Sequence, residues 1–355
     1  MAAKVISISN DGGSNYNNLP GSEGSFEVNG EAIDDTILGQ TYQSNEVGLV
    51  DWKVSSNGIF KGFAGYLAEI YDPGTPTGMT DEATTLVSGK TYQIDDITKR
   101  MLDRGVAIII DDAASPVAAV DILNIDYLFG RVTFTSGYSV SGAITFDTAS
   151  YLPLVQLARA NSYTLTMTAD AIDESDFVAV QANAGTRIFT PGLRSVNLEL
   201  GGIFDDAASF KDVITARTEL IISLDVVGDG STEARGFFKL ATTSQGGAVG
   251  ALEDETLNFN LQVPVEETNP AVEFPFQWQF TATTLQQSLQ DCLTSWLTEL
   301  NTYDVNYLPQ GTTGQSPLDG ITGEFMVSDI SLSGGLAAMN VFTVELQGTG
   351  QFTVV

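Results

Sequence analysis

The side chains that could do chemistry in this sequence are almost all carboxylates. The 355 residues include 45 Asp and Glu, 15 Lys and Arg, one Cys and no His. Without histidine the chain lacks the usual general base at neutral pH, the Ser-His and Cys-His nucleophile pairs, and the commonest zinc ligand. It also contains neither a Gly-x-x-x-x-Gly-Lys-Ser/Thr loop nor a Gly-x-Gly-x-x-Gly turn, so nucleotide binding has no support.

Two kinds of carboxylate chemistry remain. A pair of carboxylates could hydrolyse a glycosidic bond, but among 45 acidic residues some lie close together by chance. Carboxylates with backbone carbonyls could hold calcium, and the candidate clusters are Asp225, Asp229 and Glu233 around a glycine loop, and Asp34 with Asp35. Neither cluster has the spacing of a recognised calcium loop, and a solvated turn is the favoured interpretation. We predict no enzymatic activity, no metal and no cofactor.

The single cysteine lies in the clearest helical pattern of the chain. Apolar residues recur at helical spacing from Leu285 to Leu300, with polar residues between them, which predicts an amphipathic helix over residues 285–300 laid across a sheet. Cys292 falls on its apolar face, where a buried thiol is the expected role. One cysteine allows no intrachain disulfide, which suits a protein made in the cytoplasm.

The charge distribution limits the partners. The formal net charge is −30, and no basic residue follows Lys239, whereas thirteen acidic residues occur from Glu253 to Glu345. An acidic surface repels phosphate, so conventional nucleic-acid binding through a basic surface is not expected. Two explanations stay open: acidity that keeps an abundant protein soluble, or a channel wall along which DNA passes without sticking.

Composition predicts a mainly β chain with a core. Hydrophobic residues make up 43% and charged residues 17%, and 35 Gly accompany many Thr, Ser and Val. These proportions favour short strands joined by tight turns. The first residues lack the apolar region of a secretory signal, and no stretch approaches the roughly 20 apolar residues of a membrane span, so we expect a soluble protein.

Repeated motifs predict two domains. The segment 25–36 resembles 164–175 at an offset of 139, and Gly48-Leu49 with Gly58-Ile59-Phe60 matches Gly192-Leu193 with Gly202-Ile203-Phe204 at an offset of 144. We interpret these matches as a duplication of a β-sandwich domain. The predicted organisation is an N-terminal arm at 1–24, a first sandwich at 25–155, and a second at 156–355 that contains the helix and a C-terminal hairpin from strands 323–332 and 340–355.

Several strand segments resemble the major tail proteins, or tail tube proteins, of siphophages. They are Thr91 to Arg100 followed by Val106 to Asp111, Asp126-Tyr127-Leu128-Phe129-Gly130-Arg131-Val132-Thr133-Phe134, Gly236 to Leu240 leading to Leu257 to Leu261, and the closing Leu332-Ser333-Gly334-Gly335 and Leu346 to Gly350. The similarity is spread over most of residues 20–350. It implies a β-sandwich flanked by a helix, and subunits joined into stacked rings around a channel for the tape-measure protein and later for DNA.

The resemblance places this chain in the tail of a virion, assembled in the host cytoplasm, with a tape-measure protein, a tail terminator and a distal tail protein as partners. With two tube-type domains per chain, three chains could form a pseudo-sixfold ring; single domains would need a hexamer. The acidic residues expected to face the channel are Glu324, Asp329 and Glu345. Because Glu324 and Asp329 are an odd number of residues apart, a regular strand would point them to opposite faces unless a bulge intervenes.

Other functions were weighed against the tail tube. A head-decoration or tail-completion protein would form a finite oligomer. An acidic surface-layer module would need secretion and a calcium response, and a carboxylate-based hydrolase would need a cleft and measurable turnover. A structural, self-assembling virion protein for genome ejection is the function that the sequence favours.

Overall fold

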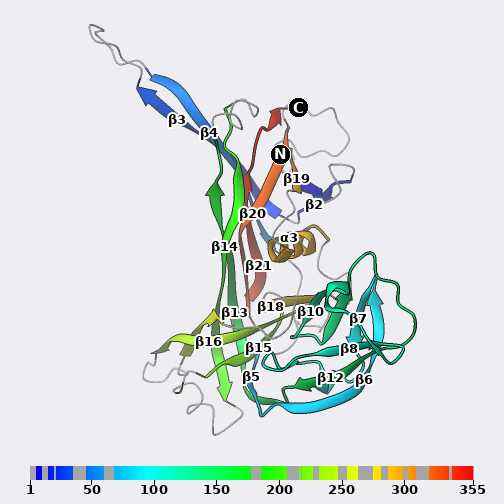
Figure 1. Cartoon of the computed structure of the whole chain (residues 1–355). Coiled ribbons are helices and arrows are strands. Elements are labelled where there is room, and N and C mark those ends of the chain that lie inside the picture. The colour runs from blue at the N-terminus through cyan, green and yellow to red at the C-terminus, as the bar shows by residue number, and fades with distance from the viewer. Residues whose placement is uncertain are drawn as a thin grey trace. The chain divides into compact units, whose positions relative to one another are not determined.

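A computed structural model describes most of the chain (Figure 1). The described residues are 5–9, 15–19, 21–34, 45–59, 68–176, 185–205, 216, 218–226, 232–246, 254–262, 275–280, 287–298, 303–308, 320–335 and 338–354. The chain is mainly β, as the composition predicts. None of the described helices has the length and apolar character needed to cross a membrane.

The chain forms two compact units, and neither is a continuous half of the sequence. Unit 1 comprises residues 1–63, 164–196 and 282–355, and unit 2 comprises 64–163 and 197–281. This division differs from the predicted boundary between residues 155 and 156. The organisation into two duplicated domains stays a prediction.

Unit 1 is built on an antiparallel sheet in the order β3-β4-β21-β20, with β19, β1 and β2 continuing from β20. The strands are β1 Val5–Ser9, β2 Asn17–Asn18, β3 Gly21–Asp34, β4 Asn45–Ile59, β19 Tyr303–Leu308, β20 Ile321–Gly335, β21 Ala338–Gly348 and β22 Thr353–Val354, which pairs with β20. Strands β20 and β21 form a hairpin where the sequence predicts one, but β21 ends at Gly348 and does not continue to residue 355. Part of the predicted N-terminal arm, however, is β1, a strand with buried Ile6 and Ile8.

The predicted helix is α3, Gln287–Thr298, and it packs against β20. Leu289, Cys292, Leu293 and Trp296 are buried, so the helical apolar spacing identified the correct face. Burial raises the pKa of the Cys292 thiol, with Asp291 adding to the effect. A neutral, buried thiol is a poor nucleophile, which agrees with a packing role for this residue.

Alternation along β4 shows how the unit 1 sheet is covered on one side. Trp52 and Val54 are fully buried, whereas Lys53 between them is exposed. Side chains of a strand alternate between the two faces of its sheet. One face therefore contributes to the core, while the other carries polar residues.

The β3–β4 hairpin extends away from the other strands of unit 1 (Figure 1). Its two strands pair antiparallel from Gly21↔Gly58 to Asp34↔Asn45, with register shifts near Gly21 and Gly30. From Glu27 to Glu31 every residue of β3 is exposed, including Val28 at 44%. Strand β3 thus exposes side chains of both faces over this segment, which suits it to contact with another molecule.

Both members of the sequence repeat lie on long hairpins. The first set of motifs falls on β3 and β4, and the second on β13, Leu154–Asp173, and β14, Phe189–Asp205. Ser25 pairs with Ser55, and Asn29 with Asp51. Adding the repeat offsets of 139 and 144 to Asn29 and Asp51 gives Thr168 and Ser195, whose hydroxyl oxygens lie 2.7 Å apart. The two hairpins thus share a register.

Unit 2 contains a sheet in the order β10-β11-β7-β6-β12-β8-β9. Its strands are β6 Thr77–Ser88, β7 Thr91–Ile94, β8 Ile109–Asp112, β9 Ser115–Pro116, β10 Ile122–Asp126, β11 Arg131–Phe134 and β12 Ile144–Tyr151, with short 3-10 turns η1 Ile97–Lys99 and η2 Ala119–Asp121. One cluster holds buried side chains from all these strands except β9, among them Met79, Ile94, Ile110, Val132 and Phe146. The sheet must therefore curl around a shared core.

A second set of strands completes unit 2. It consists of β5 Ala68–Pro73, β15 Leu220–Asp225, β16 Thr232–Gly246, β17 Asp254–Leu261 and β18 Phe276–Phe280, paired in the order β17-β16-β15-β5-β13, with β18 also on β16. Leu128, Phe129, Ile221 and Phe237 meet in a buried cluster. This cluster joins the β10–β11 turn to the β15–β16 hairpin.

Candidate functional site: an acidic sheet face and an arginine cluster

A β-bulge brings two of the predicted acidic residues onto one face of the sheet. Val327 pairs with Leu346, but Asp329 pairs with Glu345, so Ser328 is an extra residue in β20. Glu345 and Leu346 are neighbours in β21 and point to opposite faces, so their partners Asp329 and Val327 also point to opposite faces. Glu324 is three residues before Val327 and therefore points away from the face of Val327. Glu324 and Asp329 thus share one face.

Each of these acidic residues has another carboxylate directly across the sheet. Asp329 is opposite Glu345, and Glu324 is opposite Asp304 of β19. Glu324 and Glu345 are exposed, and Asp329 and Asp304 are partly exposed. The three predicted residues thus lie on one sheet face, which also carries the buried pair Met326 and Gln347 between Glu324 and Asp329. Asp304 was missed by the sequence analysis. We call Asp304, Glu324, Asp329 and Glu345 the acidic face.

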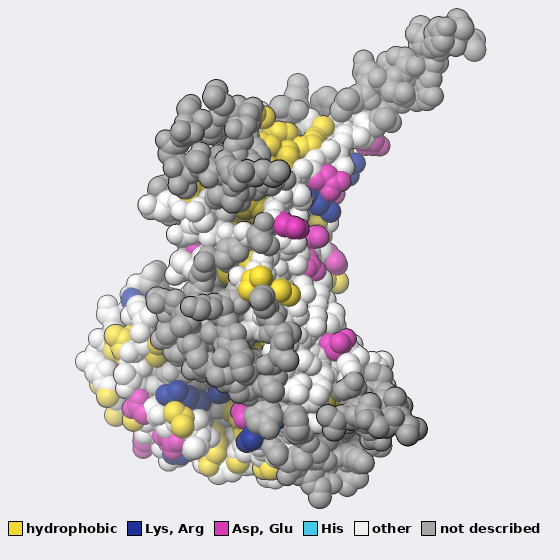
Figure 2. All heavy atoms as spheres, turned by 180° about the vertical axis from the view of Figure 1, so that it is seen from behind, with side chains coloured by type: hydrophobic (Ala, Val, Ile, Leu, Met, Phe, Trp, Pro, Cys, Tyr) yellow, Lys and Arg dark blue, Asp and Glu magenta, His cyan; other side chains and the backbone are white. Residues whose placement is uncertain are grey.

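Basic side chains are sparse around the acidic face. On β4, Ser55 pairs with Glu345 and Lys53 pairs with Gln347, while Lys53 is also opposite Glu27 of β3. Figure 2 shows Asp and Glu side chains following one another along the base of the β3–β4 hairpin and below it, interrupted by a few Lys and Arg. Negative charge therefore predominates among the exposed side chains of this sheet face.

Burial raises the pKa of Asp329, and the charge of Glu345 raises it further. The folded state therefore holds a proton on Asp329 more tightly than the unfolded chain does. The stability linked to this group is fully present below its unfolded pKa and is lost as the pH rises through the folded pKa. At neutral pH, the pair costs stability.

We expect Asp329→Asn to increase the free energy of unfolding at neutral pH by about 0.5 kcal/mol, because like charges directly opposite each other in a sheet repel. The gain should shrink as the pH falls and wild-type Asp329 becomes protonated. Urea unfolding at neutral and at acidic pH measures both effects. Glu27→Gln is the matched control, since Glu27 faces Lys53 instead of an acid; an equal gain in that variant would contradict the assignment.

The calcium clusters suggested by the sequence lie only in part within the described residues. Among the described residues, no group of three or more His, Cys, Asp or Glu side chains is arranged to hold a metal ion. Asp225 and Glu233 are cross-strand partners, Asp34 ends β3, and Asp229 and Asp35 lie outside the described residues. Glu233 instead accepts a hydrogen bond from Arg235 Nε at 2.6 Å.

A second group of charged residues, in unit 2, surrounds the turn between β10 and β11. The buried Asp126 carboxylate accepts hydrogen bonds from the backbone N–H groups of Leu128, at 2.9 Å, and Phe129, at 3.0 Å. Gly130 then adopts a left-handed φ of 62°, and its carbonyl accepts a hydrogen bond from Ile94 N. The Asp126 side chain and Gly130 together fix this turn.

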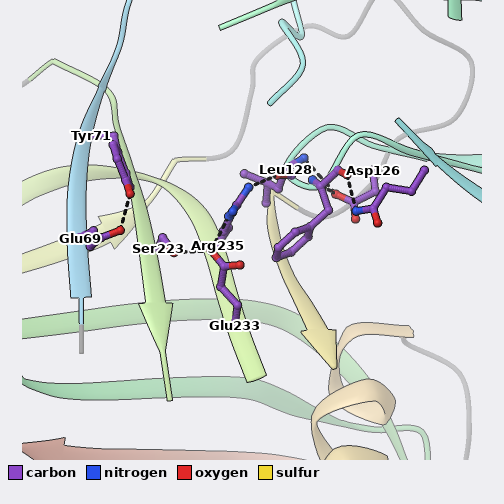
Figure 3. Close-up of polar contacts among 9 residues, drawn as sticks. Glu69, Tyr71, Asp126, Leu128, Ser223, Glu233 and Arg235 are labelled. Atoms are coloured by element: carbon purple, nitrogen blue, oxygen red, sulfur yellow. Dashed lines mark hydrogen bonds and ion pairs between the residues drawn. The ribbon is translucent and has the colours of Figure 1, made fainter. Parts of the chain in front are cut away.

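Two guanidinium groups contact the Phe129 ring at the centre of that turn. Arg131 Cζ lies 5.0 Å and Arg235 Cζ 4.8 Å from the ring centroid. Arg235 Nη1 also donates to the Leu128 carbonyl at 3.1 Å, as Figure 3 shows. These cation–π and hydrogen-bond contacts hold both arginines in place.

Arg100 is the third arginine of this cluster. Its Nε donates to the Ile94 carbonyl at 2.7 Å, and its backbone lies against Gly130. Burial lowers the pKa of Arg100, and the charges of Arg131 and Arg235 lower it further. We call Arg100, Arg131 and Arg235 the arginine cluster.

A polar row crosses the strands next to the cluster. In register, Arg159 of β13 pairs with Glu69 of β5, Glu69 with Ser223 of β15, Ser223 with Arg235 of β16, and Arg235 with Gln277 of β18. Figure 3 shows part of this row, with Tyr71 donating to Glu69 and Ser223 donating to Glu233. Such a connected network fixes the position of Arg235.

Three of the segments that resemble tail tube proteins meet at this place. Residues 91–100 supply Arg100, residues 126–134 supply the turn and Arg131, and residues 236–240 supply Phe237, which packs in the same buried cluster as Phe129. The sequence analysis missed the cluster. Five of the chain's 15 basic residues lie from Lys90 to Arg131, and this concentration of positive charge was the signal that could have identified it.

Comparison with known proteins gives partial likenesses. No protein-family model matches the chain, and none of the curated proteins matches it. A chain from the tail of an empty gene transfer agent (GTA) particle, refined helically with C6 symmetry, aligns with a TM-score of 0.26 and 15% identity over 33% of this chain and 87% of its own. A chain from the virion of a native GTA particle aligns with a TM-score of 0.27 and 15% identity over 36% of this chain and 89% of its own. Overlaps this small establish neither a family nor a function.

Proposed function

We propose that this protein is a structural subunit of a bacteriophage-type tail tube. In this proposal copies of the chain assemble into rings, the rings stack into a tube, and the acidic face lines the channel through which the tape-measure protein and then DNA pass. The protein is a component of the virion tail, assembled in the host cytoplasm. The tail terminator and the distal tail protein are its partners at the two ends.

The acidic face carries this proposal. Like charges directly opposite each other destabilise a sheet, yet two such carboxylate pairs lie on the acidic face of unit 1. A surface of this kind repels phosphate, which is what a conduit for DNA requires. The same stability cost would serve no purpose in a protein whose acidity only keeps it soluble.

Two further observations support assembly. Strand β3 of the β3–β4 hairpin exposes every side chain from Glu27 to Glu31, which suits contact with a neighbouring copy. Three of the sequence segments that resemble tail tube proteins meet in one place in unit 2. The shared register of the β3–β4 and β13–β14 hairpins favours a trimeric ring with pseudo-sixfold symmetry over a hexamer.

We expect the purified protein, when concentrated, to form hollow tubes that negative-stain electron microscopy detects. Cryo-EM of the tubes would then show three chains per ring, with Glu324, Asp329 and Glu345 on the channel wall. A finite oligomer would instead indicate a head-decoration or tail-completion protein. Tubes with these three side chains on the outer wall would contradict the role of the acidic face, and six chains per ring would contradict the trimer.

A further inference from the structure

The arginine cluster is an excess of positive charge in a strongly acidic chain. Arg131 Nη1 lies 3.9 Å from Asp126 Oδ2, and Arg235 is hydrogen-bonded to Glu233. Arg100 forms no ion pair with any described residue and donates instead to a neutral carbonyl. Arg131 and Arg235 each have a carboxylate nearby, whereas Arg100 has none in an ion pair within the described part of the chain.

Nearby acids do little to balance Arg100. Asp95 and Asp96 favour its charged form, but the Asp96 carboxylate accepts hydrogen bonds from the backbone N–H and the hydroxyl of Thr98 and lies 3.7 Å from Lys99. Burial also raises the pKa of Asp126, which weakens it as a counter-charge. A partly buried cation without a matching anion is costly, and a carboxylate placed beside it recovers that cost.

The cluster is also fixed before any partner arrives. Arg235 is tied to Glu233 and to the Leu128 carbonyl, Phe129 lies against both Arg131 and Arg235, and Gly130 holds the backbone of Arg100. Arg100 itself is partly exposed. Guanidinium groups held in this way bind a planar carboxylate in a forked geometry without losing much side-chain freedom.

We propose that the arginine cluster is a docking site for a carboxylate of a second copy of this chain. The argument for this occupant is charge complementarity, because each copy carries 45 acidic residues against 15 basic ones. Two copies repel each other over most of their surfaces, so a cationic site fixes where they meet and in which orientation. The proposal adds a specific contact to the assembly proposed above. It rests on that proposal in requiring that copies of the chain associate, but it does not require that they form a tube.

The test compares full-length Arg100→Gln with wild type and with Lys99→Gln. Lys99 is the neighbouring cation, but it already has Glu82 and Asp96 as ion-pair partners. Sedimentation velocity over a concentration series gives the threshold for self-association, at several NaCl concentrations between about 0.05 and 0.5 M. We expect Arg100→Gln to raise the threshold about tenfold at low salt and to flatten its salt dependence. Lys99→Gln should change neither, and Arg100→Lys should restore part of the loss.

The outcomes separate this proposal from the tube. If Arg100→Gln is folded by circular dichroism and forms tubes at the wild-type threshold, docking at the cluster is overturned and the tube stands. If wild type forms only a finite oligomer that Arg100→Gln dissociates, docking stands and the tube fails. A wild type that stays monomeric overturns both. Binding of fluorescent DNA that Arg100→Gln abolishes, with unchanged self-association, would show phosphate as the occupant and overturn docking.

Discussion

Gly130→Ala is expected to lower the free energy of unfolding of unit 2 by about 3 kcal/mol. An L-residue in the left-handed region costs about 1–2 kcal/mol, and the φ of Gly130 is 62°. An added Cβ would also lie 2.8 Å from both the Cα and the carbonyl oxygen of Arg100. Because both atoms belong to the backbone, neither can swing aside, and overpacking of this kind costs about 1–3 kcal/mol more.

Gly89 offers a matched control in the same unit. Its φ is 51°, but an added Cβ would meet no atom within 4 Å. Gly89→Ala should therefore pay only the conformational cost, about 1 kcal/mol. Urea unfolding of both variants measures the difference. Equal losses would mean that the approach of Arg100 to Gly130 contributes nothing.

Gly130→Ala also bears on the arginine cluster, because Gly130 sets the distance between Arg100 and the Phe129–Arg131 turn. If the variant remains folded, we expect weaker self-association as well as lower stability. Gly89→Ala should lower stability without changing self-association.

The local elements were predictable because their signals are short in range. Apolar spacing along residues 287–298 gave the helix and its buried face, and two strand signals around Ser333-Gly334-Gly335 gave the C-terminal hairpin. Alternation also indicated which residues of a regular strand share a face. Each of these inferences depends on residues within about two turns or a few strand positions.

The acidic face shows where such rules stop. Strict alternation of side chains along β20 would place Glu324 and Asp329 on opposite faces. One extra residue, Ser328, puts them on the same face. No glycine or proline marks this bulge in the sequence. Its position depends on how β20 pairs with β21, which is a property of the sheet and not of the strand alone.

The arginine cluster and the two compact units depend on contacts between distant parts of the chain. Arg100 follows the turn η1, Arg131 begins β11 and Arg235 lies in β16, and no spacing rule connects them. The repeat motifs at 25–36 and 164–175 were found by comparison along the chain, but hairpins β3–β4 and β13–β14 both contribute to unit 1. Sequence similarity within a chain indicates common local structure and leaves open which segments fold together.

The second large effect concerns Trp52, which lies against glycines of two other strands in the core of unit 1. Its side chain is fully buried, and its Nε1 donates to the Gly350 carbonyl at 3.0 Å. A Cβ on Gly348 would lie 2.0 Å from Trp52 Cε2, and one on Gly323 would lie 2.7 Å from Cζ2. Both positions must be glycine for the indole to lie flat against β20 and β21.

Gly348→Ala is therefore expected to lower the free energy of unfolding by about 3 kcal/mol, because Phe26 and Phe352 pack against the ring and prevent it from moving away. Trp52→Leu alone should cost about 3 kcal/mol through the cavity and the lost hydrogen bond. In the double variant the added methyl group enters space that the indole has left, so Gly348→Ala should then cost less than about 1 kcal/mol. A double-mutant cycle by urea unfolding measures this coupling, and additive losses would mean that Gly348 and Trp52 do not constrain each other.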